Sequence, residues 1–362
     1  MKHPVRLALA FLLTPIALAL QLWAAKHTTE IEQVYSRKIY PLFAAFFSTV
    51  FGAVPFPVIG ILLILVAVIS ITRLIFRIHK AGRSGLLHGL LHFASFLSVL
   101  FFLFTILWQL NYNRLPLAEN LGYKTASPST AELIAVTAGE ISAINALCPQ
   151  LSWDNQGHSY DSSGFASMAS RINDTYGRFS ASQPLGKSFF SNVPAYPKQV
   201  SPKGLLASFS IQGVYVAFTF EPLVDTSYPM FMWPFVIAHE SAHLKGFARE
   251  DEANHLAYLA DCQNPDIFTQ YSAHMNALLY LSSALGSTNS SVLNAQLQTL
   301  DPRAKADIDH YNTYVAKHHG IFSKTGEKVN STYLQAQGQK GTRSYNGFVN
   351  LLCDRYRTTG AT

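Results

Sequence analysis

The chain has 362 residues, of which 49% are hydrophobic and only 13% are charged. Soluble domains usually carry about 25% charged residues, so this composition excludes a disordered or coiled-coil protein and disfavours an ordinary cytosolic enzyme. A formal net charge of +6 would suit nucleic-acid binding if the basic residues lay on a folded domain. They do not, because residues 1–111 hold nine Lys and Arg against two acids, whereas residues 112–362 have a net charge of −1. No nucleic-acid partner is therefore expected.

Three apolar segments in the first third of the chain predict a membrane domain over residues 1–111. Each approaches the roughly 20 residues needed to cross the hydrocarbon core of a bilayer. They lie at about residues 5–25, 54–72 and 86–110. The second segment is expected to extend upstream through the apolar stretch that begins at Pro41. The expected protein is thus a multi-pass protein of the cell membrane, with the lipid bilayer as a partner.

The basic residues predict the orientation of these spans. A short loop with no acidic residue is expected between the second and third spans, holding Arg73, Arg77, Lys80 and Arg83. Because Lys and Arg concentrate on the cytoplasmic side, the N-terminus is expected to be cytoplasmic and residues 112–362 extracytoplasmic. A cleaved signal peptide is the alternative for the first span. Trp23-Ala24-Ala25 makes a poor cleavage site, which favours a retained anchor.

Residues 112–362 predict one helix-dominated globular domain, so the expected fold class is α+β, with three N-terminal transmembrane helices followed by this domain. Ser129 and Glu132 form a capping-box pattern that opens a helix to about Leu147. A second helix is expected over Ser163–Tyr176, an irregular connection over Pro194–Pro202, and a strand over Ile211–Phe220. From Pro229 the pattern is helical nearly to the end, with breaks expected at Gly246, Pro265, Gly286, Gly320 and Gly338.

This domain holds all three cysteines of the chain, Cys148, Cys262 and Cys353. An odd number leaves at least one thiol unpaired. A Cys148–Cys262 disulfide is possible in an exported domain, but three buried thiols are the simpler expectation.

The sequence His239-Glu240-Ser241-Ala242-His243 is a HExxH motif. Residues four apart share one face of a helix, so His239 and His243 can bind one metal ion. Glu240 is placed to take a proton from water at that metal. Imidazole and carboxylate ligands, with one coordination position left for water, suit zinc. Gly246, three residues after the second histidine, can end the helix in a left-handed turn.

The segment Glu250-x-x-Ala253-Asn254 resembles the E-x-x-A-D element of gluzincin peptidases. The resemblance implies that Glu250 is the third zinc ligand and that Asn254 accepts a hydrogen bond that orients a ligand histidine. The chain has Asn where gluzincins have Asp, which would leave the histidine less basic. Glu252 is the alternative third ligand. For the acidic group as a whole, the alternative is a charged first turn favoured by the helix dipole.

Several features follow one another in a characteristic order: three N-terminal spans, Gly213-Val214-Tyr215, Phe220-Glu221, HE-x-A-H-x-x-G-F and Glu250-Asp-Glu-Ala-Asn254. This order resembles the uncharacterised bacterial membrane family called domain of unknown function 3810, most specifically from Gly213 to Cys262. The resemblance implies a zincin-like metallopeptidase domain. The E-x-E-A-N element is also similar, more distantly, to short-spacer HExxH peptidases of the type that cleaves phage repressors.

The expected function is a membrane-anchored zinc metallopeptidase that hydrolyses peptide or protein substrates on the outer face, with Glu240 as general base. The strand before the motif is expected either to align extended substrate by backbone pairing or to lie inside the core. Candidates for stabilising the oxyanion are His274, Tyr271, His255 and Tyr258. Glu221 and Asp225 either line the cleft or simply end the strand.

Two alternative functions fit parts of the same sequence. A catalytically silent zincin-like membrane protein could bind a partner or a cell-envelope component, although such a protein has no need of Glu240. An intramembrane-cleaving protease would carry the motif inside a span, but Tyr228–Leu244 is short for a span and is bounded by Asp225 and Lys245.

Overall fold

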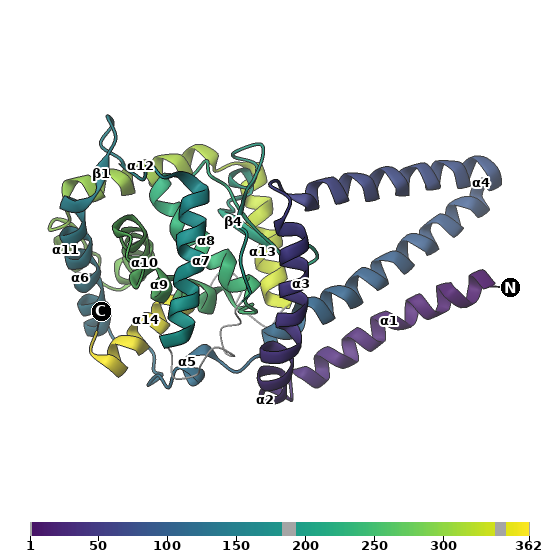
Figure 1. Ribbon diagram of the computed structural model, residues 1–362, viewed down its shortest axis with the longest axis horizontal. Helices are drawn as coiled ribbons and strands as arrows, with labels where there is room; N and C mark the ends of the chain where they lie inside the picture. The colour runs from purple at the N-terminus through teal and green to yellow at the C-terminus, as the bar shows by residue number, and fades with distance from the viewer. Residues whose placement is uncertain (1, 183–192, 337–344, 362) are drawn as a thin grey trace. The chain divides into compact units, whose positions relative to one another are not determined.

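The computed structural model describes residues 2–182, 193–336 and 345–361 of a predominantly helical chain (Figure 1). The chain divides into two compact units. The first unit comprises Met1–Leu115 with Val216–Phe220, and the second comprises Pro116–Tyr215 with Glu221–Thr362. The boundary falls after Leu115 rather than at the expected residue 111, and the short Val216–Phe220 segment groups with the first unit.

The first unit is built from helices. They are α1 (Lys2–Ala24), α2 (Thr28–Glu30), a π-helical segment (Ile31–Ile39), α3 (Tyr40–Gly52), α4 (Val58–Leu107) and a 3₁₀ segment (Gln109–Asn113). Figure 1 shows α4 as two long arms joined by a sharp turn. Gly82 makes that turn with φ 53° and ψ −133°, a conformation that residues with a Cβ rarely adopt.

In the part of the chain that the structure describes, three helices are long and apolar enough to cross a membrane: Val58–Lys80, Gly85–Leu107 and Thr130–Gln150. Ala10–Ala24, within α1, is a shorter apolar helix. The first two match the expected second and third spans, and their length and hydropathy indicate a membrane protein. The window in Thr130–Gln150 belongs to the second unit and is 44% buried, against 0% for Val58–Lys80.

Two expectations about the second span are wrong. It does not extend upstream to Pro41, because α3 ends at Gly52 and a turn separates it from α4. The helix also runs on to Lys80, so Arg73, Arg77 and Lys80 lie on the helix and not in a loop. The uncharged part of the helix ends where these basic residues begin. The helix continues through them, because long basic side chains can extend toward polar headgroups without breaking a helix.

Polar side chains fix the packing of α1 against α4 within the first unit. The Thr14 and Ser98 hydroxyls lie 2.6 Å apart, and the Gln21 amide donates to Thr105 at 3.0 Å and to Gln109 at 2.6 Å. Apolar side chains that face lipid do not favour one alignment of two helices over another. Hydrogen bonds between the helices therefore select the alignment.

A buried ion pair joins the π-helical segment to the end of the same unit. Arg114 donates to both Glu32 carboxylate oxygens at 2.8 and 2.9 Å, and Arg37 donates to one of them at 2.8 Å. Burial alone would raise the pKa of Glu32, but the two guanidinium groups hold it below its usual value. Removal of either partner of such a pair would leave an uncompensated buried charge, which strongly destabilises a fold.

The second unit contains the remaining helices and the strands of the described chain, apart from the last residue of β4 (Gly213–Val216), which groups with the first unit. Its helices are α5 (Leu117–Asn120), α6 (Thr130–Leu147), α7 (Gly164–Ser182), α8 (Trp233–Leu244), α9 (Glu250–Cys262), α10 (Ile267–Thr288), α11 (Ser290–Leu297), α12 (Pro302–His318), α13 (Ile321–Ala336) and α14 (Tyr345–Thr359). Its strands are β1 (Ser152–Trp153), β2 (Ser159–Tyr160), β3 (Lys198–Gln199), β4 (Gly213–Val216) and β5 (Glu221–Val224).

The expected elements of this unit are found, with shifted ends. The Ser129 capping box forms with both of its hydrogen bonds, and α6 ends at Leu147 as expected. The expected strand shortens to β4 because the chain turns after Val216. The expected irregular connection contains β3, which gains its regular structure only by pairing with β5. The described chain does break at Gly246, Pro265 and Gly320, whereas Gly338 lies outside the described residues.

The break expected at Gly286 is wrong, because α10 continues to Thr288. Packing explains why the glycine is accommodated inside the helix. A Cβ at Gly286 would lie 3.1 Å from a methyl group of Leu293 on α11, so the missing side chain permits close contact between the two helices.

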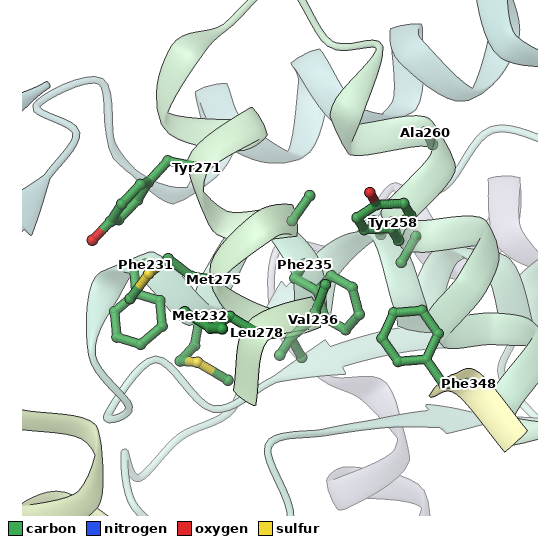
Figure 2. Close-up of a cluster of buried hydrophobic side chains, with 14 of the residues drawn as sticks. Phe231, Met232, Phe235, Val236, Tyr258, Ala260, Tyr271, Met275, Leu278 and Phe348 are labelled. Atoms are coloured by element: carbon green, nitrogen blue, oxygen red, sulfur yellow. The ribbon is translucent and has the colours of Figure 1, made fainter. Parts of the chain in front are cut away.

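The core of the second unit forms around α8, α9 and α10 (Figure 2). Phe235 and Val236 of α8 are buried with Met275 and Leu278 of α10, and α14 adds Phe348 beside Tyr258 of α9. The apolar run that precedes the HExxH motif is therefore the buried face of α8, so hydrophobic burial holds the motif helix in place.

Strands β3, β5 and β4 form a three-stranded sheet in that order, with β3 parallel to β5. In the described chain β4 is thus an edge strand. Glu221 opens β5 and pairs with Lys198 of β3 at 2.6 Å, and both side chains are buried. This pairing assigns Glu221 to the sheet rather than to a catalytic cleft.

Asp225 holds the loop that leads into β4. Its carboxylate accepts hydrogen bonds from the backbone N–H groups of Gly204, Leu206 and Ala207, and from the hydroxyl of Ser227. Burial opposes ionisation, but these donors hold the pKa of Asp225 below its usual value. Asp225 therefore organises the sheet and its loop.

Asp225→Asn is expected to destabilise the full-length protein by about 1–3 kcal/mol at pH 7, because a buried charged acceptor of several donors is replaced by a weaker one. A lowered folded-state pKa adds stability above the unfolded value near 3.9, and that stability is lost as the pH falls through the folded value. The deficit in thermal midpoint should therefore shrink between pH 7 and pH 3. Asp309→Asn is the control, because Asp309 is exposed. An equal deficit at both pH values would contradict the assignment.

Candidate metal centre

The HExxH motif lies at the C-terminal end of α8, directly before a sharp corner in the chain. The helix ends at Leu244, and Gly246 adopts φ 90°, which redirects the backbone. After three further residues α9 begins at Glu250, with Arg249 extended before it. A carboxylate in the first turn of a helix is favoured by the partial positive charge of the N-terminus.

This corner brings three side chains together. One ligand atom from each of His239, His243 and Glu250 lies within 4.8 Å of the others. Nε2 of His239 is 3.2 Å from one oxygen of Glu250, and Nε2 of His243 is 3.6 Å from the other. The side chains are 13%, 8% and 19% exposed, so solvent reaches the group.

The backbone of the corner orients one of the histidines. Nδ1 of His243 donates a hydrogen bond to the carbonyl oxygen of Phe247 at 2.7 Å, which leaves Nε2 facing Glu250. Nδ1 of His239 is buried and has no hydrogen-bond partner within the described residues. The orienting role expected of Asn254 is not found, since its amide lies 3.5 Å from the hydroxyl of Tyr280 and bonds neither histidine.

The alternative ligand, Glu252, serves the fold instead. It is buried, and one of its oxygens accepts hydrogen bonds from the backbone N–H of Leu117 at 2.8 Å and from Arg249 at 2.5 Å. It is not part of the three-residue group. Glu250 points toward the histidines because it stands two positions earlier, on a different face of α9.

Opposite charges dominate the electrostatics of the site. Burial opposes ionisation of Glu250, but the two histidines hold its pKa well below the usual value. Burial likewise opposes protonation of His243, yet the adjacent carboxylate of Glu250 raises its pKa to about 9. The carboxylate thus stabilises positive charge at the point where the two imidazoles converge.

Glu240 differs from Glu250 in its surroundings. It is 4% exposed, and its Oε2 atom has no hydrogen-bond partner among the described residues. Burial raises its pKa to about 7, against the opposing effect of both histidines. The backbone of β4 crosses directly over it, because a Cβ at Gly213 would lie 2.6 Å from Oε1 and 2.9 Å from Cγ. A glycine is needed for this close approach.

The four residues expected as oxyanion stabilisers are engaged elsewhere. His255 contacts the hydroxyl of Tyr123, Tyr258 donates to Glu140, Tyr271 donates to Asp307, and His274 pairs with Glu140. Closeness in sequence does not predict which face of a long helix meets the site.

Tyr215 was not among the expected site residues, but its ring lies beside His243, with centroids 6.4 Å apart. It comes from β4, two residues after Gly213. The signal that points to Tyr215 is strand alternation, since side chains two apart share one face of a strand.

All three cysteines lie in the described chain and are free, so no Cys148–Cys262 disulfide is present. Cys148 and Cys353 are buried, whereas Cys262 is partly exposed. The expectation of three buried thiols is therefore wrong for Cys262, which lies at the end of a helix.

Comparison with known proteins adds the family. No curated protein and no solved structure matches the chain. The family described as "Protein of unknown function (DUF3810)" matches residues 35–353, which is most of the chain and includes His239, His243 and Glu250. The chain therefore belongs to the DUF3810 family.

Proposed function

We propose that the protein is a membrane-anchored zinc metallopeptidase that hydrolyses peptide bonds on the outer face of the membrane, with Glu240 as general base. The observation that carries this proposal is the convergence of His239, His243 and Glu250 beside the buried Glu240, whose Oε2 atom has no hydrogen-bond partner among the described residues. A purely structural helix corner has no need of two imidazoles and two carboxylates at one point.

The three converging side chains fit zinc by their chemistry. Two imidazole nitrogens and one carboxylate oxygen are the ligand set of many catalytic zinc sites, which leave a fourth position open. The hydrogen bond from Nδ1 of His243 to the Phe247 carbonyl oxygen directs Nε2 toward the point where the three side chains converge, so a metal bound there would take the place of the Nε2 proton. When bound, zinc would supply Lewis-acid polarisation of a scissile carbonyl and would lower the pKa of water.

The chain's own residues would handle the proton. Glu240 follows His239 directly on α8, so its carboxylate borders the site without replacing a ligand. The carboxylate would take the proton of the attacking water and pass it to the leaving amine. Its buried position favours proton exchange near neutral pH, because burial weakens the preference for the charged form.

Strand β4 supports a peptide as the substrate. It is an edge strand of the described sheet, and its backbone lies against Glu240 at Gly213. An extended peptide that paired with β4 would therefore place one of its peptide bonds near the general base. Tyr215, on the same strand and beside His243, is the side chain we assign to the developing oxyanion.

The outer-face placement is proposed from the distribution of charge. Arg73, Arg77, Lys80 and Arg83 all lie close to the turn at Gly82 that joins the two arms of α4. Basic residues at this end of two apolar helices favour a cytoplasmic turn. Both the N-terminus and this turn would then be cytoplasmic, and the second unit would be outside.

Reporter fusions in cells test the orientation. Alkaline phosphatase, which is active only outside the cytoplasm, is expected to be active when fused after Thr362 and inactive when fused after Lys80. The reverse pattern would contradict the outer-face proposal while leaving the metal centre untouched.

Metal analysis of the purified full-length protein tests the ligands. Wild type and Glu240→Gln are expected to hold about one zinc per chain, whereas His243→Ala and Glu250→Ala should lose it, because each removes a coordinating atom. Glu252→Gln is the control for the alternative ligand and should retain zinc. A wild-type protein without zinc affinity, or a Glu250→Ala variant that binds zinc as tightly, would refute the site.

Peptide-library digestion tests the chemistry. Glu240→Gln is expected to lower kcat/KM by about 100-fold or more at unchanged zinc content, because the general base is lost. Gly213→Ala should also lower kcat with zinc retained, since the new Cβ displaces Glu240. Gly177→Ala is the matched control, because a Cβ there meets nothing within 4 Å. A zinc-loaded wild type that cleaves no peptide would favour a silent binding domain.

A further inference from the structure

A second group of reactive side chains lies where α6, α9 and α10 pack together, and it shares no residue with the metal centre. Nδ1 of His274 lies 2.6 Å from one carboxylate oxygen of Glu140. Nε2 of the same ring lies 3.8 Å from Sγ of Cys262, the last residue of α9. A thiol, an imidazole and a carboxylate therefore stand in series. We call these three residues the thiol site.

Glu140 sets the orientation of the imidazole. Its side chain is fully buried, and its second oxygen accepts a hydrogen bond from the hydroxyl of Tyr258 at 2.7 Å. Both carboxylate oxygens are thus engaged, which holds the carboxylate in one position. With its Nδ1 proton directed at Glu140, His274 presents the lone pair of Nε2 to the thiol. This tautomer can accept the proton of Sγ, and the carboxylate stabilises the imidazolium that forms.

The other two cysteines lack this arrangement. Cys148 and Cys353 are buried, and burial raises the pKa of each thiol to about 12. Neither contacts a histidine in the described chain, whereas Cys262 does and is partly exposed. Reactive thiols combine access with a basic neighbour, and inert structural thiols have neither.

We propose that Cys262 is a nucleophilic thiol, activated by His274 and positioned through Glu140, that undergoes exchange with low-molecular-weight disulfides. The Sγ proton passes to Nε2 of His274. The resulting thiolate attacks one sulfur of the disulfide R–S–S–R, so a Cys262–S–S–R bond forms, the R–S–S–R bond breaks and one thiolate R–S⁻ leaves. The protein becomes reversibly modified at the end of α9.

The charged side chains near the thiol site come from three helices besides α9. Glu140 lies on α6, His274 on α10, and Arg355 of α14 lies over the ring of Tyr258, which precedes Cys262 by one helical turn. Burial alone would lower the pKa of His274, but the charges of Cys262 and Glu140 together raise it to about 11. Both neighbours therefore favour the imidazolium that forms when Nε2 takes the thiol proton.

The rate of labelling by 4,4′-dithiodipyridine tests this proposal on the full-length protein in detergent. Cys262→Ala gives the background from the other two thiols. After its subtraction, wild type at pH 6 is expected to react at least about tenfold faster than His274→Gln, because an ordinary thiol is almost wholly protonated there. Glu140→Gln, which retains an acceptor for Tyr258, should show a smaller loss at pH 6 than His274→Gln.

The wild-type pH profile keeps the test decisive if either variant fails to fold. Between pH 6 and pH 8 the Cys262 rate is expected to change by only a few fold, whereas an ordinary thiol gains about tenfold per pH unit. An ordinary profile, or a His274→Gln rate at pH 6 equal to that of wild type, would overturn the proposal and leave the group a structural hydrogen-bond cluster. Zinc content is measured in parallel and should not change in Cys262→Ala.

Discussion

The corner between α8 and α9 is the constraint on which the candidate metal centre depends. Gly246 takes a positive φ that ends α8, and this turn carries the carbonyl of Phe247 back to Nδ1 of His243. The same reversal places Glu250, as the first residue of α9, opposite both imidazoles. A single backbone conformation therefore sets the direction of one histidine and the position of the carboxylate. A residue with a Cβ at position 246 would strain the turn and disturb both.

Hydrogen bonds to other helices anchor both helices of the corner. The backbone N–H of Phe235 donates to the hydroxyl of Ser272 on α10, and the Ala238 carbonyl accepts a hydrogen bond from Tyr176 of α7. On the opposite side, Glu252 ties α9 to the backbone of Leu117. Hydrogen bonds in a dry interior are costly to break, so they resist the motions that would separate the three candidate ligands. The site is held by contacts with α5, α7 and α10, which the HExxH sequence itself does not contain.

Local patterns predicted the features that depend on neighbouring residues. The i, i+4 spacing of His239 and His243, the capping box at Ser129 and the turn at Gly246 each involve a few consecutive positions, and the structure forms the last two as expected. The roles of Asn254 and His274 depended on long-range packing, and the structure gives both residues other partners. Gly213 shows the same limit, because its contact with Glu240 joins a strand to a helix more than twenty residues away. The periodicity of apolar residues predicts which face of a helix or strand is buried, but not which other element packs against that face.

Helix α9 connects the candidate metal centre with the thiol site, since Glu250 is its first residue and Cys262 its last. The helix dipole has opposite effects on a negative charge at these two ends. It favours the Glu250 carboxylate at the N-terminus and disfavours a thiolate at the C-terminus. Nucleophilicity at Cys262 therefore cannot come from the helix and must come from His274, whose imidazolium is the kind of charge that a helix C-terminus favours. The dipole thus favours the imidazolium of His274, which accepts the proton, and disfavours the thiolate of Cys262, which loses it. Glu140 contacts only the imidazole, so its carboxylate adds stabilisation of the imidazolium alone.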